Sequence, residues 1–199
     1  MKFTPELPFA GGRLRPLQHE DVDILFQLYS KPEIPGQKPP AAIESMAKLV
    51  DYSVQMAATQ RGMMWLVEVD GQVQGIVSAF DWQPSWLRLM LRVDGLPSLA
   101  LAQRQAALQT AMDFLGSKYH IFNFAYQWIA GQNPEIKTML HQLGFSLRAT
   151  LRDGWRVGEG FADVEQYHFV LDKQKPKAGR LGEFDNPAQD LNKSVGGRV

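Results

Sequence analysis

Polar and apolar residues follow two different periods along the chain, and these periods separate predicted strands from predicted helices. Residues 85–93, SWLRLMLRV, alternate strictly, so that Trp86 and the arginines fall on one face and the leucines on the other. Residues 134–143 instead place apolar side chains at helical spacing, from Ile136 to Leu143. The first stretch therefore predicts a strand and the second a helix.

The same two patterns, read together with turn residues, divide most of the chain into a series of elements. An Asp-Gly pair at residues 70–71 joins two apolar strands, as in a hairpin. The order is strand, two helices, three strands, helix, strand, helix and two strands, which indicates an α+β domain with a mixed sheet. Strands are expected at 12–18, at 63–82 as a pair, at 85–93, at 121–130 and at 146–172 as a closing hairpin, and helices at 19–34, 41–60, 98–119 and 134–143.

The helix at 134–143 is flanked by residues that favour its start and its end. Asn133 is a good N-cap because its side chain can accept a backbone N–H of the first turn, and Pro134 suits the first helical position. Gly144 can take the left-handed conformation that ends a helix, and Phe145 can fold back on the last turn. These residues explain a helix and do not yet point to a function.

Composition narrows the class of protein. The 199 residues suit one domain with a real core, and 45% of them are hydrophobic. The formal net charge is zero, so no global charge points to nucleic acid or to an acidic membrane surface. The chain has no cysteine, which excludes disulfides, thiolate catalysis and cysteine-based zinc sites. The histidines are isolated, without metal-ligand spacing, and we predict no metal.

The start of the chain bears on where the protein is located, and its end on how far the folded domain extends. The first residues, MKFTPELPFAGG, lack an apolar run long enough for a signal peptide, and no segment reaches the length of a membrane span. We therefore expect a cytoplasmic protein. The sequence does not decide its oligomeric state, and both a monomer and a homodimer stay open. Residues 173–199 are rich in Lys, Gly and Asn and poor in large apolar residues. The prediction is a domain at 1–172 followed by a C-terminal tail at 173–199.

Four stretches of sequence carry a family resemblance. They are GRLRPLQHEDVDILFQLYSKPEI, WLVEVDGQVQGIVSAF, AGQNPEIKTMLHQLGF and LRDGWRVGEGFADVEQYHF. In this order and spacing they resemble the GNAT superfamily of N-acyltransferases, most closely its ribosomal-protein N-terminal acetyltransferase branch. Each motif alone is weak, but together they span nearly all of residues 12–172.

The resemblance implies a fold and an activity. The fold would be a mixed, twisted sheet of about seven strands flanked by about four helices. Strands 85–93 and 121–130 would be parallel and splayed apart at one end. The activity would be transfer of an acetyl or other acyl group from acyl-CoA to a primary amine of a small molecule or a protein N-terminus. Acetyl-CoA would be the co-substrate and an amine the acceptor.

The resemblance also implies where the acyl donor binds. In such proteins an Asn near the end of the fifth strand reaches into the acyl-CoA site, which would be Asn133, although a plain helix cap accounts for that residue as well. Backbone N–H groups at the start of the helix at 98–119 would hold the pyrophosphate, since small side chains let a phosphate approach. The implied donor-binding residues are Leu91, Val93, Ser98, Ala100, Ala102 and Asn133.

The chain departs from the family pattern at two places. Residues 93–105, VDGLPSLALAQRQ, have no glycine inside the turn where relatives carry spaced glycines, and Arg104 is the only nearby cation. Because alanine does not easily adopt a positive φ, the anion site implied here would be weak or rebuilt. The alternative interpretation of this segment is a simple helix start. The Tyr and Ser that relatives carry after the Asn are replaced by Leu140 and Ile136, and neither side chain can give up a proton.

Two carboxylates are candidates for taking a proton from the acceptor amine. Glu68 lies on the predicted second strand and Asp81 at the end of the third, and either can act directly or through water. Each can equally be read as a solvated strand residue. Two functions therefore stay open. The retained Asn133 favours an active N-acyltransferase. The lost glycines and Tyr favour a catalytically silent relative that senses a ligand or binds a partner.

The composition of residues 173–199 generates a first prediction. Deleting them should leave the melting temperature nearly unchanged, because few large apolar side chains there can join a core. Thermal melting of the chains 1–172 and 1–199, followed by circular dichroism, measures the difference. A drop of many degrees would show that these residues are packed.

Overall fold

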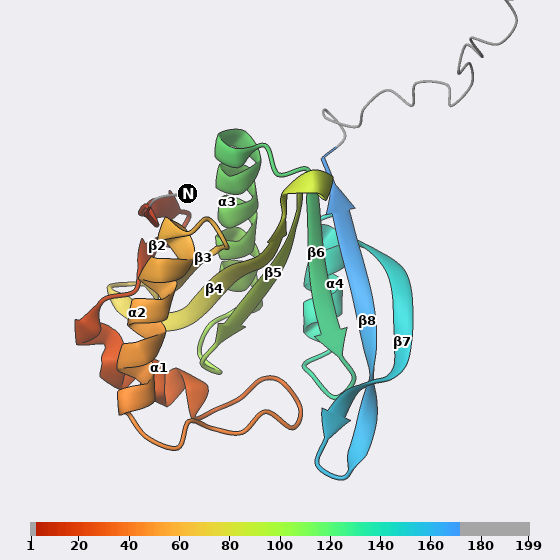
Figure 1. Ribbon diagram of the computed structural model, residues 1–199, viewed down its shortest axis with the longest axis horizontal. Coiled ribbons are helices and arrows are strands. Elements are labelled where there is room, and N and C mark those ends of the chain that lie inside the picture. The colour runs from red at the N-terminus through yellow and green to blue at the C-terminus, as the bar shows by residue number, and fades with distance from the viewer. Residues whose placement is uncertain (1–2, 172–199) are drawn as a thin grey trace, which may run out of the picture.

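The computed structural model describes residues 3–171, which form one mixed sheet of eight strands with helices on both faces (Figure 1). The strand order is β1-β2-β3-β4-β5-β6-β8-β7. Neighbouring strands are antiparallel except β5 and β6, which are parallel. The strands are β1 (Leu7–Phe9), β2 (Gly12–Pro16), β3 (Met63–Val69), β4 (Gln72–Gln83), β5 (Arg88–Gly95), β6 (Asn123–Ile129), β7 (Ser146–Val157) and β8 (Gly160–Val170).

The helices of residues 3–171 divide between the two faces of the sheet. Helices α1 and α2 cover one face, and α3 and α4 cover the other (Figure 1). The α-helices are α1 (Val22–Tyr29), α2 (Glu44–Ala58), α3 (Leu101–Tyr119) and α4 (Glu135–Gln142), and short 3-10 turns lie at His19–Asp21 and Pro84–Trp86.

The predicted α+β class and the mixed sheet flanked by four helices are confirmed. The eighth strand, β1, is three residues long, which is too short for an alternating pattern to reveal it. The strand predicted at 85–93 begins only at Arg88, because Pro84 starts a 3-10 turn and Leu87 is left-handed with φ 47°. The predicted tail at 173–199 lies outside the described residues.

The part of the sheet around β3 and β4 is buried on both faces, against two separate cores. Strand β3 is apolar at every position except Glu68, so its alternate residues supply both cores. Trp65 packs in the core on the α3 side, whereas Met64 and Leu66 pack with α1 and α2. The indole N–H of the fully buried Trp65 donates to the carbonyl of Pro5 at 3.0 Å. The central strands are therefore held from both sides.

Strands β5 and β6 pair over only the first part of their length. The pairing runs from Arg88 with Asn123 to Met90 with Ala125 and then stops, although β5 continues to Gly95. The parallel, splayed pair implied by the family resemblance is therefore confirmed. Each strand keeps its other neighbour, β4 or β8, and the two halves of the sheet diverge (Figure 1). Among residues 3–171 the facing edges beyond this pairing have no strand partner.

The end of α4 follows the predicted motif. Gly144 has φ +86°, and its N–H donates to the carbonyl of His141 at 2.9 Å. The N–H of Phe145 reaches back to the carbonyl of Leu140 at 2.9 Å. The Phe145 ring is 2% exposed and packs on the ring of Phe169, so the turn delivers an apolar anchor directly into the core.

This turn generates a prediction with a matched control. Gly144→Ala should cost about 1–2 kcal/mol for the left-handed backbone, plus a packing penalty, since its Cβ would lie 3.1 Å from the Phe169 ring. Gly71→Ala has the same backbone cost, at φ +74°, but its Cβ would meet nothing within 4 Å. Urea unfolding should therefore show a larger loss for Gly144→Ala, and equal losses would contradict this assignment.

Candidate functional site

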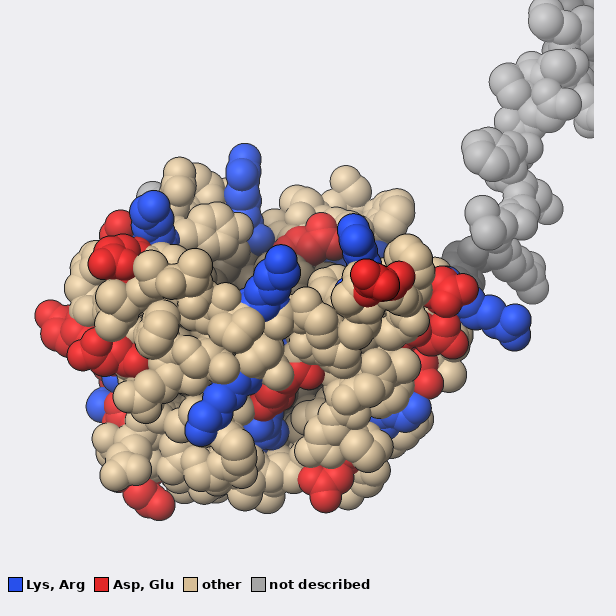
Figure 2. Space-filling view, turned by 90° about the horizontal axis from the view of Figure 1, so that it is seen from below, with Lys and Arg blue, Asp and Glu red and all other residues tan. Residues whose placement is uncertain are grey.

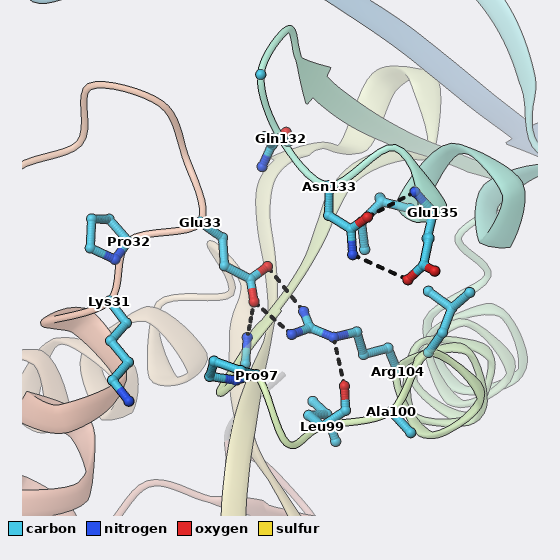
Figure 3. Close-up of a pocket in the computed structure, with 14 residues that line it drawn as sticks. Lys31, Pro32, Glu33, Pro97, Leu99, Ala100, Arg104, Gln132, Asn133 and Glu135 are labelled. Atoms are coloured by element: carbon cyan, nitrogen blue, oxygen red, sulfur yellow. Dashed lines mark hydrogen bonds and ion pairs between the residues drawn. The ribbon is translucent and has the colours of Figure 1, made fainter.

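A cleft of about 560 Å³ opens where β5 and β6 have separated, at the carboxyl ends of both strands. Three segments supply its walls. They are the loop after α1 (31–33), the turn after β5 with the first residues of α3 (95–104), and the turn after β6 with the first residues of α4 (131–136). Figure 3 shows these residues converging from elements that are far apart in the sequence. We call this space the cleft.

An ion pair crosses the cleft between α3 and the loop after α1. The Arg104 guanidinium contacts the Glu33 carboxylate twice, with Nη1 to Oε2 at 3.0 Å and Nη2 to Oε1 at 2.6 Å (Figure 3). The N–H of Gly95, at the end of β5, donates to the same Oε1 at 2.9 Å. Arg104 is also fixed by the carbonyls of Leu99 at 3.2 Å and Leu96 at 3.3 Å. A buried cation thus meets a carboxylate with well-matched geometry.

Of the three small residues predicted to lie at the donor phosphates, Ser98, Ala100 and Ala102, only Ala100 lines the cleft. Ala100 lines the cleft as the N-cap of α3, and its N–H donates to Oε1 of Gln103 at 3.1 Å. Because α3 begins only at Leu101, Ser98 lies in the preceding turn and lines a different hollow on the α1 side. Ala102 is exposed on α3 and does not line the cleft.

Asn133 lies on the opposite wall of the cleft (Figure 3). Its Oδ1 accepts the backbone N–H of Glu135, the first residue of α4, at 3.0 Å. The predicted hydrogen bond to the first turn is therefore present, but the N-cap is Pro134, one residue later than predicted. The Asn133 carbonyl accepts the indole N–H of Trp128 at 3.2 Å, which ties the turn to β6. The residue is therefore held in place at the cleft by its backbone and by its side chain.

Leu91 and Val93 lie in the part of β5 that has left β6. Both residues are 1% exposed, and their side chains belong to the core beneath α3. Their side chains are therefore not available to a ligand, and only their backbone groups lie along the gap between the two strands. This placement differs from that of Asn133, which presents a side chain to the cleft.

Glu68 does not lie in the cleft. Its carboxylate accepts from Arg13 Nε and from Arg15 Nε, each at 2.8 Å, across the β2–β3 pair. Arg15 in turn holds Asp21 at 2.7 Å. The hydrogen bond from Arg15 is the main cause that lowers the pKa of the Glu68 carboxyl, assisted by Arg13. These contacts indicate a structural tie that holds β2, β3 and the start of α1 together.

Asp81 also lies away from the cleft. It sits where the register of β4 with β5 shifts, has φ +53°, and accepts a hydrogen bond from Gln83 at 3.1 Å. It lines a separate hollow with Tyr52 and Trp82. The sequence places Glu68 and Asp81 on the expected strands, but the structure does not bring either of them to Asn133.

A second hollow, of about 210 Å³, lies in the gap between β5 and β6. Arg92 is its one ionisable lining residue, and that guanidinium is paired with Asp94. Trp155 closes one side, and its indole N–H donates to the carbonyl of Pro35 at 2.8 Å. The loop after α1 contributes to both spaces, because Ile34 lines the second hollow and the adjacent Glu33 lines the cleft. The full lining is Ile34, Phe80, Met90, Leu91, Arg92, Gln127, Ile129 and Trp155.

The Glu33–Arg104 pair is the feature of the site that sequence reasoning missed. The partners are 71 positions apart, so no local pattern joins them. One signal was present in the sequence. Arg104 precedes Ala107, Leu108 and Ala111 at helical spacing, which puts a charged residue on the buried face of the helix. A charge on such a face requires a partner.

Charges of both signs are mixed over the end of the molecule that carries the cleft. Figure 2, seen from that end, shows Lys and Arg beside Asp and Glu with no large patch of one sign. Local contacts, more than a long-range field, therefore decide which anion binds here. Within residues 3–171, no three His, Asp or Glu side chains gather as a metal site would require. No helix in that range is long and apolar enough to span a membrane.

Solved acetyltransferases share this fold. The chain superposes on RimL, a ribosomal L7/L12 alpha-N-protein acetyltransferase in complex with coenzyme A, with a TM-score of 0.77 and 16% identity, covering 84% of this chain and 99% of that one. A ribosomal-protein-S5-alanine acetyltransferase from Vibrio fischeri superposes with a TM-score of 0.75 and 12% identity, covering 87% of this chain and 100% of that one. The microcin C7 self immunity acetyltransferase MccE, in complex with acetyl-CoA and AMP, superposes with a TM-score of 0.73 and 13% identity, covering 81% of this chain and 93% of that one.

No family model and no curated protein matches the sequence. At identities this low, the superpositions establish the fold alone. The chain has the fold of the GNAT acetyltransferases, including those that act on ribosomal proteins, as the four sequence stretches indicated.

The contacts of Glu68 generate a prediction. Glu68→Gln should lower the free energy of unfolding by about 1–3 kcal/mol at pH 7, because two guanidinium groups lose a charged acceptor. Folding lowers the pKa of Glu68, so its contribution is complete above the ordinary value of 4.5 and is lost as the pH falls through the lowered value. The difference between variant and parent should therefore shrink in acid.

The control for this prediction is Glu6→Gln. Glu6 makes the same type of contact with Arg13, at 3.3 Å, but its side chain is 58% exposed. It should cost less than about 0.5 kcal/mol. Urea unfolding at several pH values measures both variants. A Glu68→Gln protein as stable as the parent at pH 7 would refute the structural role.

Proposed function

We propose that this protein is an N-acyltransferase that moves an acetyl or other acyl group from acyl-CoA to a primary amine of a small molecule or a protein N-terminus. The observation that carries the proposal is the gap between β5 and β6, which opens into a cleft at the carboxyl ends of both strands. Ligands of open sheets with parallel strands bind at such ends. The coenzyme A and acetyl-CoA complexes of RimL and MccE, which share the fold, support acyl-CoA as the donor.

The gap suits the extended arm of an acyl-CoA donor. The backbone of Leu91 and Val93 lies along the unpaired edge of β5, where amide groups of the arm can pair as an added strand does. Asn133 lines the facing wall, and its side chain can contact the arm. The donor phosphates would reach the start of α3 at Ala100, where backbone N–H groups and the helix dipole favour negative charge.

The second hollow is the proposed binding site of the acceptor amine. That hollow lies in the same gap, so an amine there can approach a thioester held between the strands. Its lining is mostly apolar and includes no Asp or Glu. This composition favours an amine attached to an apolar group over a polycation, whose positive charges would find no carboxylate among these residues.

The reaction requires few side chains. The amine nitrogen attacks the thioester carbonyl carbon, the carbon–sulfur bond breaks, the amine loses a proton and the thiolate gains one. Holding the two reactants at attack distance supplies much of the rate, and a backbone N–H can stabilise the oxyanion. Glu68 and Asp81 line neither the cleft nor the second hollow. We propose that water relays the proton, which slows the reaction by about 10²–10⁴ relative to a positioned acid or base.

The alternative function is a catalytically silent protein that keeps the fold to sense a ligand or bind a partner. The observation that favours it is the Glu33 carboxylate, which already occupies the N–H of Gly95 and the Arg104 guanidinium in the cleft. If no acyl donor displaces this carboxylate, the site cannot hold acyl-CoA. Donor binding therefore separates the two functions.

Calorimetric titration with acetyl-CoA tests the proposal. The parent should bind with micromolar affinity. Ala100→Leu should remove most of that binding, because a larger side chain at the N-cap of α3 fills the mouth of the cleft. Ala58→Leu, at the exposed end of α2, is the matched control and should bind like the parent. An absence of binding by the parent to any acyl-CoA at millimolar concentration would leave only the silent alternative.

A further inference from the structure

The Arg104 side chain forms a built anion site on the wall of the cleft. Its guanidinium is 9% exposed, and the carbonyls of Leu96 and Leu99 fix its orientation. Two guanidinium nitrogens and the N–H of Gly95 point at one carboxylate, that of Glu33. This arrangement of donors is also the one that recognises a phosphate group, because Arg–carboxylate and Arg–phosphate pairs share a bidentate geometry.

The two partners of the ion pair are held very differently. Arg104 is anchored by backbone carbonyls on its own side of the cleft. Apart from its contacts with Arg104 and Gly95, the Glu33 carboxylate makes no hydrogen bond recorded among residues 3–171. Glu33 is also the more exposed partner, at 24%, and it reaches in from the loop after α1 (Figure 3). Glu33 is therefore the partner that can leave by rotation of its side chain.

We propose that Glu33 is a tethered competitor for the anion site at Arg104 and Gly95, and that a phosphate group of the donor takes this site by displacing the Glu33 carboxylate. Ala100 and Arg104 line the same cleft, within one turn of the start of α3, so both meet the same part of a ligand. Donor binding then exchanges the Glu33 carboxylate for a phosphate at Arg104 and Gly95. This inference rests on the proposed function for the identity of the donor, but the anion exchange itself does not require acyl transfer.

The exchange has two consequences. In the ion pair, Glu33 neutralises a buried guanidinium, whose charge would otherwise be left uncompensated. When a ligand arrives, it must displace a carboxylate whose tether gives it an effective concentration in the millimolar range or above. The affinity for any anion is therefore reduced, and ligands carrying several negative charges, such as a pyrophosphate, are favoured over a single carboxylate.

A structural tie is the competing explanation, and it predicts the opposite result. If Glu33 only anchors the loop to α3, then neutralising it loosens that wall, and anion affinity falls or stays the same. If Glu33 is a competitor, neutralising it frees Arg104 and anion affinity rises.

The experiment uses inorganic pyrophosphate as the probe, titrated calorimetrically into the full chain at fixed ionic strength. Glu33→Gln should bind pyrophosphate about tenfold more tightly than the parent, because a tethered carboxylate no longer competes. Glu44→Gln removes the same charge from an exposed position at the start of α2 and should bind like the parent. Equal or weaker binding by Glu33→Gln would overturn the proposal.

Two further variants keep the test decisive if Glu33→Gln folds poorly. Glu33→Asp keeps the charge but shortens the reach by one methylene, so it should tighten pyrophosphate binding by a smaller factor. The double variant Glu33→Gln/Arg104→Gln leaves no buried charge and should bind pyrophosphate more weakly than Glu33→Gln and Glu33→Asp. If the double variant bound pyrophosphate as tightly as the better binder of Glu33→Gln and Glu33→Asp, Arg104 would not be the anion site.

Acetyl-CoA titrated into the same variants separates this inference from the proposed function. Tighter pyrophosphate binding by Glu33→Gln, with no acetyl-CoA binding by any variant, would support the anion exchange and contradict the acyltransferase. Acetyl-CoA binding by the parent, with unchanged pyrophosphate and acetyl-CoA affinities in Glu33→Gln, would support the acyltransferase and overturn the exchange.

Discussion

The site depends on the early end of the pairing between β5 and β6. The sheet is continuous from β1 to β7, but these two strands share only the register from Arg88–Asn123 to Met90–Ala125. Beyond it, β5 stays with β4 and β6 stays with β8, and the twist of the sheet carries the two halves apart. Two backbone edges thereby lose their strand partner in the middle of the sheet, where neither forms the outer edge with which another chain could pair.

The packing around this gap explains why it does not close. The side chains of Leu91 and Val93 are locked in the core beneath α3, so β5 cannot move toward β6 without breaking that core. On the other side, Trp128 donates to the carbonyl of Asn133 and fixes the turn into α4. The walls on the β5 and β6 sides are therefore both anchored to the rest of the fold. The part of the cleft lining best placed to adapt is the Glu33 side chain.

The elements were predictable from the sequence wherever a long periodic pattern was present. The hairpin of β3 and β4, the Asp-Gly turn between them and the Gly-Phe end of α4 follow directly from residue type and spacing. The short strand β1 and the 3-10 turn at Pro84 were missed, because three residues carry too little periodicity and a proline can sit at a strand end or before it.

The candidate site was predictable only in part. Asn133 and Ala100 both line the cleft, and the sequence singles them out because the ends of helices are encoded locally. Their contact with a donor stays a prediction. Glu68 was a reasonable candidate as an acid on a buried strand, but its arginine partners come from β2, whose pairing no local pattern reveals. Glu33 and Arg104 show the same limit, because a contact between a loop and a distant helix depends on the completed fold.

The central claim is that the unpaired edge of β5 is the binding surface for an acyl-CoA arm. Amide hydrogen exchange, measured with and without acetyl-CoA, tests it most directly, because backbone groups that gain a hydrogen-bond partner exchange more slowly. The account predicts new protection of the N–H groups of Leu91 and Val93, where the strand has lost its parallel neighbour. Protection confined to other parts of the chain, with Leu91 and Val93 unchanged by saturating acetyl-CoA, would contradict it.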